Sequence, residues 1–474
     1  MTKSTKVSLA TAADDRAPPV GPQRGGSPDE LMDFGKRLRS TVPRLSHGVW
    51  KKPADRADPI AQIQASDHER LPELLPVRYG RMLVSPFTFY RGAAGVMAAD
   101  LATTPATGLR VQACGDCHLL NFGGFATPER NIVFDINDFD ETLPAPWEWD
   151  VKRLAASFVL AARSAGLSDS VGHDAAVGAA TSYRKRLSAY ARMSPLEVWY
   201  ASVSAEDFIS LVTDPDRKKF ARRRIAKAAE TSGSELDYPR LAGMTGGQVH
   251  IRDAPPLIFH PEVARAPDFM ARLEAVLATY RETLPDERRA LLDHYRLVDA
   301  AIKVVGIGSV GRRCWIALMM SAANDPLFLQ FKEARASVLE PYAGTSLYPH
   351  HGQRVVVGQR LMQPASDVFL GWVKGEDGRH LYARQLRDAK IKPLIETFDA
   401  EMLQVYAAGC GWALARSHAK AGDAWTISGY LGSNGHFDDA MGKFALAYAD
   451  QAEADHAELK RAVRAGKVQV LQEA

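Results

Sequence analysis

The fold of this chain is decided by Cys114-Gly-Asp-Cys-His-Leu-Leu-Asn-Phe-Gly123, followed shortly by Asn131-Ile-Val-Phe-Asp-Ile-Asn-Asp-Phe-Asp-Glu141. In the first stretch Asp116 and Asn121 lie close together in a short loop. In the second, the apolar run Ile132–Phe134 predicts a strand that delivers a group of carboxylates at its end. Carboxylate and amide oxygens from two neighbouring segments are the ligands that Mg²⁺ prefers in proteins.

The spacing of these residues predicts a role for each. Asp-x-x-x-x-Asn followed by Asp-Phe is the pattern with which kinase-type phosphotransferases place a catalytic base and two magnesium ligands. Asp116 is therefore the candidate base, and His118 beside it is a second candidate catalytic residue. Asn121 and Asp138 are the candidate magnesium ligands. Alternative metal ligands in the same segment are Asp135 and Asp140.

Three residues outside these loops are candidate supports. Asp150 lies at the start of an apolar segment, Trp149 to Ala165, which predicts a buried helix. We expect the carboxylate of Asp150 to support the loop that contains Asp116. His418 is either a helix-packing histidine or a hydrogen-bond partner of the catalytic loop. Arg91 is either a surface charge or a clamp for phosphate or carboxylate, because guanidinium presents a planar fork of donors.

The same loop has other interpretations. Cys114-x-x-Cys117-His118 matches the attachment pattern of c-type haem, which requires export, and no secretory signal is expected from this N-terminus. Zinc on these three residues would need a fourth ligand or a water, and the sequence has no second cysteine pair. Asp- and Asn-rich loops are also common as simple turns. The partners found elsewhere in the chain favour the phosphotransferase interpretation.

The composition describes an ordinary globular protein. The chain has 474 residues, 46% hydrophobic and 24% charged, with a formal net charge of +3. This balance gives no reason to expect nucleic acid or a membrane as a partner, and no stretch is long and apolar enough to predict a transmembrane helix. Four cysteines argue against a disulfide framework. We therefore expect a cytoplasmic protein.

A glycine-rich stretch, Gly306-Ile-Gly308-Ser309-Val-Gly311, lies far downstream of the carboxylates. It matches a dinucleotide-binding fingerprint, which requires a helix directly after the glycines. The apolar segment that follows, Cys314–Met320, fits a strand equally well. The glycines then form a hairpin that covers phosphates, because their backbone amides must approach the phosphates closely.

Lys332 ends another predicted strand, Leu327 to Ala334, and is a candidate for neutralising nucleotide phosphates. Such a lysine is held by a carboxylate from the next helix, for which Glu340 is the first candidate and Glu333 the second. Further strands are expected at 354–363 and 381–386, and a helix at 334–339. Helices are expected again at 397–421 and about 436–466.

Two resemblances follow from these motifs. Ser85-Pro-Phe-x-Phe-Tyr-Arg-Gly, Asn137-Asp-Phe-Asp-Glu-Thr and Gln330-Phe-Lys-Glu-Ala, among others between about 35 and 460, resemble a bacterial family of unknown function (domain of unknown function number 2252). Cys114-Gly-Asp-x-His-x-x-Asn with Asp138-Phe-Asp is similar to the catalytic half of aminoglycoside and choline phosphotransferases. In those phosphotransferases a histidine occupies the position that Cys114 has in this chain.

The second resemblance implies a protein-kinase-like fold, but the parts occur in a different order. In kinases the glycine loop and lysine precede the catalytic loop, whereas here they follow it, at 306–340. We therefore predict an α+β, two-lobed, circularly permuted kinase-like fold, since domain termini often lie close together. Lys332 and Asp138 should then face one cleft, within about 10 Å of each other. The helices at 397–421 and 149–165 should pack together.

We predict four parts along the chain. They are a disordered tail at 1–30, a helical lobe with the catalytic and metal-binding loops at 31–296, a small antiparallel-sheet lobe that binds the nucleotide at 297–392, and C-terminal helices at 393–474 that return to the helical lobe.

The expected activity is an ATP-dependent phosphotransferase that requires Mg²⁺ and acts on a small-molecule or protein acceptor that the sequence leaves unidentified. The same site would transfer AMP if the nucleotide were bound in the reverse direction. Alternatives are a non-catalytic nucleotide-binding scaffold of the pseudokinase type and a nicotinamide-dependent oxidoreductase. The oligomeric state is left open.

Overall fold

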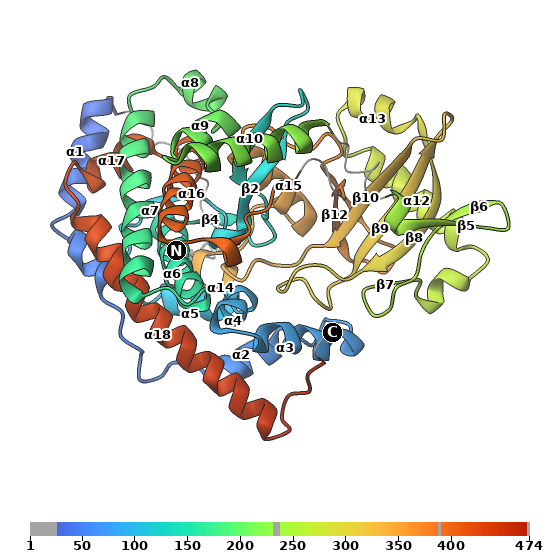
Figure 1. Cartoon of the computed structure of the whole chain (residues 1–474), viewed down its shortest axis with the longest axis horizontal. Helices are drawn as coiled ribbons and strands as arrows, with labels where there is room; N and C mark the ends of the chain where they lie inside the picture. Colours follow the sequence, from blue (N-terminus) through green and yellow to red (C-terminus); the bar gives the residue numbers. More distant parts are fainter. Residues whose placement is uncertain (1–25, 231–237, 387–389, 472–474) are drawn as a thin grey trace, which may run out of the picture.

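The computed structural model describes residues 26–230, 238–386 and 390–471. Helices gather on one side of the molecule and a six-stranded sheet stands on the other, so the chain is a mixed α+β protein (Figure 1). The disordered tail expected for residues 1–30 lies outside the described residues as far as residue 25, and helix α1 (Pro28–Leu38) begins within the expected tail.

The helical region, residues 26–230 and 390–471, is assembled from both ends of the chain. Helix α6 (Trp147–Ser164) packs against α7 (Asp169–Tyr190), and both contact α16 (Ala400–Lys420) and α18 (His436–Arg464). The contact of α16 with α6 confirms the packing predicted for these two segments. Every residue from Trp147 to Ala162 is buried, because helices surround α6.

The remaining helices of this region are shorter. Those between residues 44 and 101 are η1 (Arg44–Gly48), α2 (Pro59–Ala65), η2 (Pro72–Leu74), α3 (Leu75–Leu83), α4 (Pro86–Gly92) and α5 (Ala94–Leu101). The others are α8 (Pro195–Tyr200), α9 (Ala205–Ser210), α10 (Pro215–Glu230), η5 (Ile395–Thr397) and α17 (Ala424–Leu431). Figure 1 shows α2 to α5 in the lower part of the molecule, beside α18.

The sheet region, residues 238–386, is built around six antiparallel strands. In spatial order they are β11 (Gly371–Lys374), β12 (His380–Gln385), β10 (Pro326–Glu333), β9 (Cys314–Ser321), β8 (Tyr295–Lys303) and β7 (Ile258–Phe259). Side chains alternate between the two faces of a strand. Leu329 and Phe331 pack with Tyr280 of α12 (Phe269–Arg281), whereas Phe328 belongs to a cluster on the opposite face. Lys332 shares the face of Phe328.

The sheet region begins earlier in the chain than the predicted boundary at residue 297. The hairpin of β5 (Ala242–Thr245) and β6 (Gln248–Ile251) lies against β8, and β7 extends the sheet. Helix α12 and its neighbour α13 (Asp286–Leu292) join the apolar cluster on one face of the sheet. Helical periodicity alone could not indicate which side of the molecule these helices join.

Two predicted elements are wrong. Residues 354–363, expected as a strand, belong to helix α15 (His351–Met362). The run Val355-Val-Val favours a strand locally, but the helix packs Val355 and Val356 into the main core, and packing overrides local propensity. The helix expected at 334–339 is instead a loop that leads into the short α14 (Glu340–Ala343).

Candidate functional site

Two short ladders bring the two carboxylate-bearing loops together. Strand β1 (Arg110–Ala113) pairs with β4 (Leu143–Pro146), and β2 (Phe122–Ala126) pairs with β3 (Ile132–Ile136). The loop of residues 114–121, called the catalytic loop after its predicted role, connects β1 to β2 and ends in η3 (Leu119–Asn121). The acidic loop, residues 137–142, connects β3 to β4. Because Ala113 is opposite Leu143 and Phe122 is opposite Ile136, the two loops lie side by side.

A buried carboxylate holds the start of the catalytic loop. Asp150 accepts hydrogen bonds from the backbone N–H groups of Cys114 (2.6 Å) and Gly115 (3.0 Å). The predicted brace is therefore confirmed. His418 Nε2 lies 3.3 Å from the same carboxylate, and its Nδ1 lies 2.9 Å from the hydroxyl of Tyr183. His418 thus acts on the loop through Asp150.

Asp116 and Asn121 are fixed within this loop. Arg153 of α6 donates from Nε to Oδ1 of Asp116 at 2.8 Å and makes a second bond to the same oxygen through Nη2. The amide nitrogen of Asn121 donates to the backbone carbonyl of Asp116 at 2.6 Å. Oδ2 of Asp116 and the amide oxygen of Asn121 have no hydrogen bond to any residue that the structure describes.

The acidic loop is held by the sheet region. Lys332 Nζ lies 2.9 Å from Oδ2 of Asp140 and 3.9 Å from Oδ2 of Asp138. The hydroxyl of Tyr382 donates to Asp140 at 2.6 Å and that of Ser309 donates at 3.2 Å. The distance between Lys332 and Asp138 is within the predicted limit of about 10 Å, but only Asp138 lines the cavity described below.

The two neighbouring carboxyl groups have opposite pKa shifts. Burial and the negative charge of Asp140 raise the pKa of Asp138 above its usual value. Burial acts in the same direction on Asp140, but the charges of Lys332 and Arg312 outweigh it and hold the pKa of Asp140 below its usual range. Burial would lower the pKa of Lys332, yet the two carboxylates raise it. Lys332 is therefore a cation whose charge is directed at this loop.

The glycine stretch forms the connection of an antiparallel hairpin, as predicted. It joins β8 to β9, and Gly306 and Gly311 adopt φ values of +66° and +82°. These values favour glycine, because a Cβ atom would be strained there. The hairpin is anchored to the N-terminal helices. Arg70 Nη1 donates to the carbonyl of Gly308 at 2.9 Å, and Ile307 packs in the apolar cluster of α2 to α5.

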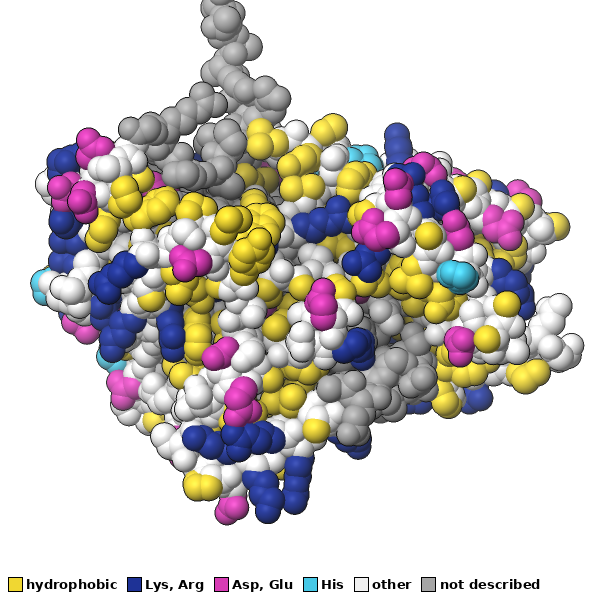
Figure 2. All heavy atoms as spheres, turned by 90° about the horizontal axis from the view of Figure 1, so that it is seen from above, with side chains coloured by type: hydrophobic (Ala, Val, Ile, Leu, Met, Phe, Trp, Pro, Cys, Tyr) yellow, Lys and Arg dark blue, Asp and Glu magenta, His cyan; other side chains and the backbone are white. Residues whose placement is uncertain are grey.

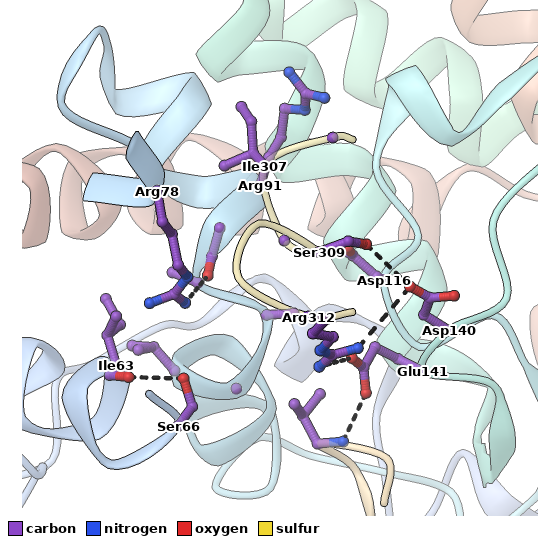
Figure 3. Close-up of a pocket in the computed structure, with 18 of the residues that line it drawn as sticks. Ile63, Ser66, Arg78, Arg91, Asp116, Asp140, Glu141, Ile307, Ser309 and Arg312 are labelled. Atoms are coloured by element: carbon purple, nitrogen blue, oxygen red, sulfur yellow. Dashed lines mark hydrogen bonds and ion pairs between the residues drawn. The ribbon is translucent and has the colours of Figure 1, made fainter. Parts of the chain in front are cut away.

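One cavity lies between these elements. The lining residues include charged and polar side chains and two glycines of the hairpin: Arg70, Arg78, Arg91, Asp116, His118, Asn121, Asp138, Asp140, Glu141, Gly306, Gly308, Ser309 and Arg312. Figure 3 shows Arg312 between Asp140 and Glu141, with Ser309 on the glycine hairpin beside them. The cavity therefore brings together the catalytic loop, the acidic loop and the glycine hairpin, which are far apart in the sequence.

Three predicted site residues lie in positions that differ from those expected. Asp135 does not line the cavity, because its fully buried carboxylate is 2.7 Å from Arg416. Glu340 accepts a hydrogen bond from the backbone N–H of Ser337. Among the described residues no ion pair joins Glu340 to Lys332, whose carboxylate partners are in the acidic loop. Asp140 lines the cavity, but Lys332 and Tyr382 already occupy its oxygens.

Glu333, the second candidate partner of Lys332, faces away from it. Its carboxylate accepts hydrogen bonds from Arg335 and from the backbone of Arg313. Neighbouring residues of a strand point to opposite faces, so Glu333 cannot reach the acidic loop that Lys332 contacts.

His118 lines the cavity as a neutral imidazole. Burial, together with the nearby charges of Arg91 and Arg153, lowers its pKa well below the usual value. Its Nε2 lies 3.9 Å from Oδ2 of Asp116, which is too long for a hydrogen bond, and its Nδ1 is buried without a partner among the described residues. His118 is therefore a buried side chain in the wall of the cavity, and its Nδ1 is not exposed to a ligand there.

The two cysteines of the catalytic loop belong to the core. Cys114 and Cys117 are buried in the main apolar cluster. The contact with Cys117 lowers the pKa of the Cys114 thiol, but burial and the charge of Asp150 outweigh it and raise that pKa to about 11. A thiol in this state is a poor nucleophile and a poor metal ligand.

Several residues of the site were not identified from the sequence. Arg153, Arg312 and Tyr382 contact the carboxylates directly, and Arg354 of α15 donates to the backbone carbonyls of Asp140 and Thr142. The role of Arg153 could have been predicted, because a positive charge in an otherwise apolar helix segment requires a buried partner. The others come from distant segments, and no local pattern indicated their role.

Helix α10 contains a basic run, residues 217–227, and none of these residues lines the cavity. Arg217 pairs with Asp399 and Arg222 pairs with Glu206, so part of its charge is neutralised. Figure 2 shows positive, negative and hydrophobic side chains interspersed on the upper face of the molecule. In the part of the chain that the structure describes, none of the helices combines the length and the apolar character needed to span a bilayer.

The comparisons with known proteins identify a family but no activity. The family model described as "Uncharacterized protein conserved in bacteria (DUF2252)" matches residues 70–462, which is most of the chain. This range contains the catalytic loop, the acidic loop, the glycine hairpin and Lys332. No curated protein and no solved structure matches the chain.

Proposed function

The chain belongs to the bacterial family DUF2252, whose description assigns no activity, and from the geometry of its cavity we propose that it is an ATP-dependent phosphotransferase that requires Mg²⁺. Its fold would be protein-kinase-like and two-lobed, in circularly permuted order. The acceptor would be a small molecule or a protein.

The observation that carries this proposal is the meeting of Lys332 with the acidic loop. Lys332 belongs to the third strand of the β8–β9–β10 meander, and the glycine hairpin is the first connection of that meander. Kinases place their glycine-rich loop and phosphate-binding lysine in the same arrangement. In this chain the lysine follows the catalytic loop by more than 200 residues, yet Nζ lies 3.9 Å from Asp138.

The residues present fit a magnesium–nucleotide complex. The nitrogen of the Asn121 amide is committed to the carbonyl of Asp116, which leaves its oxygen as the free ligand. The side chain of Asp138 is 38% exposed and lines the cavity. Magnesium bound to a nucleotide needs only one or two carboxylates, because phosphates and waters complete its coordination. When bound, it would neutralise charge that develops on the transferred phosphoryl group.

Each remaining residue has a role consistent with this reaction. Arg153 holds Oδ1 of Asp116, so the carboxylate is oriented and Oδ2 is left to accept the proton of an acceptor hydroxyl. The backbone of the glycine hairpin would cover the phosphates and Lys332 would neutralise them. Asp140 would keep Lys332 in place when no nucleotide is bound, since Nζ is already 2.9 Å from it.

A non-catalytic nucleotide-binding scaffold is the second candidate. One observation favours it: Arg153 already holds Oδ1 of Asp116 in an ion pair, so part of this carboxylate is committed to the protein itself. The nicotinamide-dependent alternative has less support, because a dinucleotide fold needs a helix after the glycines and here the antiparallel strand β9 follows Gly311.

Calorimetry with ATP, in the presence and absence of Mg²⁺, tests the proposal. Wild type should bind ATP more tightly with Mg²⁺, and Asp138→Asn should lose most of this dependence, because it removes a negative charge from a divalent site. Asp169→Asn, on the exposed N-terminus of α7, is the matched control and should behave as wild type. Equal magnesium dependence in wild type and Asp138→Asn contradicts the proposed metal site.

Turnover separates the two candidates. Asp116→Asn keeps the shape of the side chain and removes the proton acceptor, so a catalyst should keep nucleotide binding and lose transfer. Incubation with ATP labelled in the γ- or α-phosphate, in the presence of metabolite pools, distinguishes phosphoryl transfer from AMP transfer. Nucleotide binding with no transfer in wild type would favour the scaffold.

A further inference from the structure

The cavity is lined by more positively charged side chains than the phosphates of a magnesium–nucleotide complex need. Four arginines line it, and the buried Lys332 contacts Asp140, which is also a lining residue. Three of the four are already engaged. Arg70 donates to carbonyls of the glycine hairpin, Arg78 pairs with Asp67 at 2.7 Å and Arg312 pairs with Glu141 at 3.2 Å.

Arg91 is the exception. Among the described residues it has no hydrogen bond and no ion pair, and its Nε is buried without a partner. Its guanidinium lies 5.9 Å from the ring centroid of Phe87, a contact that orients the group and leaves its N–H donors free. A partly buried guanidinium without a partner is unfavourable, so a site that retains one is suited to an anionic ligand.

The backbone next to Arg91 also favours an anion. Helix α5 begins at Ala94 and has no side-chain cap. The first hydrogen bond of this helix is donated by the N–H of Met97 to the carbonyl of Ala93. The N–H groups of Ala94, Gly95 and Val96 therefore have no acceptor within the helix, and these residues line the cavity. Free N–H groups at the start of a helix attract negative charge.

Arg91 lies on the acceptor side of the cavity. Arg91 and Asp116 line the same cavity. Burial lowers the pKa of Arg91, and the charges of Asp116, Glu396 and Asp138, in that order, oppose this effect. His118, next to Asp116, is held neutral in part by the charge of Arg91. The phosphates of the nucleotide have other partners in Lys332 and the glycine hairpin. Arg91 is therefore close to the candidate base and is not required by the nucleotide.

We propose that the acceptor is a small molecule that carries a phosphate or carboxylate group, bound by Arg91 and the N-terminus of α5, with its hydroxyl directed at Asp116. This inference rests on the proposed phosphotransferase function. Asp116 takes the hydroxyl proton as the acceptor oxygen forms a bond to the γ-phosphorus. The bond from that phosphorus to the β,γ-bridging oxygen breaks, and ADP leaves with the electron pair. Cationic acceptors of the aminoglycoside or choline type would be repelled by Arg91.

Calorimetric titration with inorganic phosphate, in the presence of Mg²⁺ and a non-hydrolysable ATP analogue, tests this site. Wild type should bind phosphate together with the nucleotide, and Arg91→Gln should weaken this binding at least tenfold, on the order of one lost charge-assisted contact. Arg91→Lys should give an intermediate affinity, because it keeps the charge and loses the fork. Arg222→Gln, which removes a positive charge from exposed α10, is the matched control and should not change it.

The outcomes separate this inference from the proposed function. Equal phosphate affinity in wild type and Arg91→Gln, with both proteins folded by circular dichroism, overturns the anion site. Loss of affinity for the ATP analogue in Arg91→Gln, with phosphate failing to bind beside the nucleotide in wild type, shows that Arg91 serves the nucleotide's terminal phosphate and overturns the acceptor assignment. If wild type binds no nucleotide at all, the proposed function fails, and the acceptor assignment fails with it.

Discussion

The catalytic loop and the acidic loop lie side by side, yet they are held in different ways. The catalytic loop is fixed entirely within the helical region, by Asp150 and Arg153 of α6. The acidic loop receives Lys332, Tyr382 and Ser309 from the sheet region. The candidate base is thus positioned by its own region, whereas the carboxylates beside it are positioned only when both regions are in contact.

This difference has a consequence for the motion of the site. Partners in one rigid helix keep a loop in place whether or not the cavity is open. A loop whose partners come from a second region moves when that region moves, and its opening free energy is correspondingly lower. We therefore expect the acidic loop, and not the catalytic loop, to respond to nucleotide.

The largest expected effect comes from removing the support of the catalytic loop. Asp150→Ala leaves the buried N–H groups of Cys114 and Gly115 without an acceptor, and each unpaired group costs about 1–3 kcal/mol. The free energy of unfolding, measured by urea denaturation, should fall by about 3–5 kcal/mol. Asp169→Ala, which removes a carboxylate that is 59% exposed, should change it by less than about 1 kcal/mol. A similar loss for both variants would contradict the structural role of Asp150.

A smaller effect is expected from the contact between the two regions. Lys332→Met leaves the buried Asp140 without its nearest cation, but Tyr382 and Ser309 still donate to it, so the loss of stability should be about 1–3 kcal/mol. Hydrogen exchange should become faster in residues 137–142 and stay unchanged in 114–121. Equal acceleration in both loops would show that they are not held independently.

The smallest effect is expected from an ion-pair cluster that belongs to the sheet region alone. Hydrogen bonds that the His260 ring donates to the carboxylates of Asp299 and Asp253 outweigh its partial burial and raise its pKa to about 9. His260 is charged and stabilising below its unfolded pKa of about 6.5, and this contribution is lost as the pH rises through about 9. Because the histidine is partly exposed, the change should be less than about 1 kcal/mol.

The effect of His260 is a control for the comparison of the two loops, because His260 contacts neither of them. The free energy of unfolding of wild type should decline between pH 6.5 and 9 relative to that of His260→Gln, and hydrogen exchange in both loops should be the same in the two proteins at each pH. A difference confined to the acidic loop would mean that the far edge of the sheet also sets the position of that loop.

The sequence by itself determined the local parts of this protein. The Asp116–Asn121 spacing, the strand that leads to Asp138 and the glycine hairpin at 306–311 all follow from short-range patterns, and the structure places them around one cavity. The support of the loop by Asp150 was also predicted, since a carboxylate at the start of an apolar helix needs donors nearby.

The tertiary structure alone decided which groups those parts meet. Nothing near Lys332 in the chain indicates that its partner is Asp140 and not Glu340, because the ion pair joins strand β10 to a loop almost 200 residues earlier. Residues 351–362 became a helix, despite a β-branched run, because that form buries Val355 and Val356 in the core. Local spacing fixes which residues share a face, but the pairing of distant charges and the choice between helix and strand depend on burial against segments that only the folded chain brings into contact.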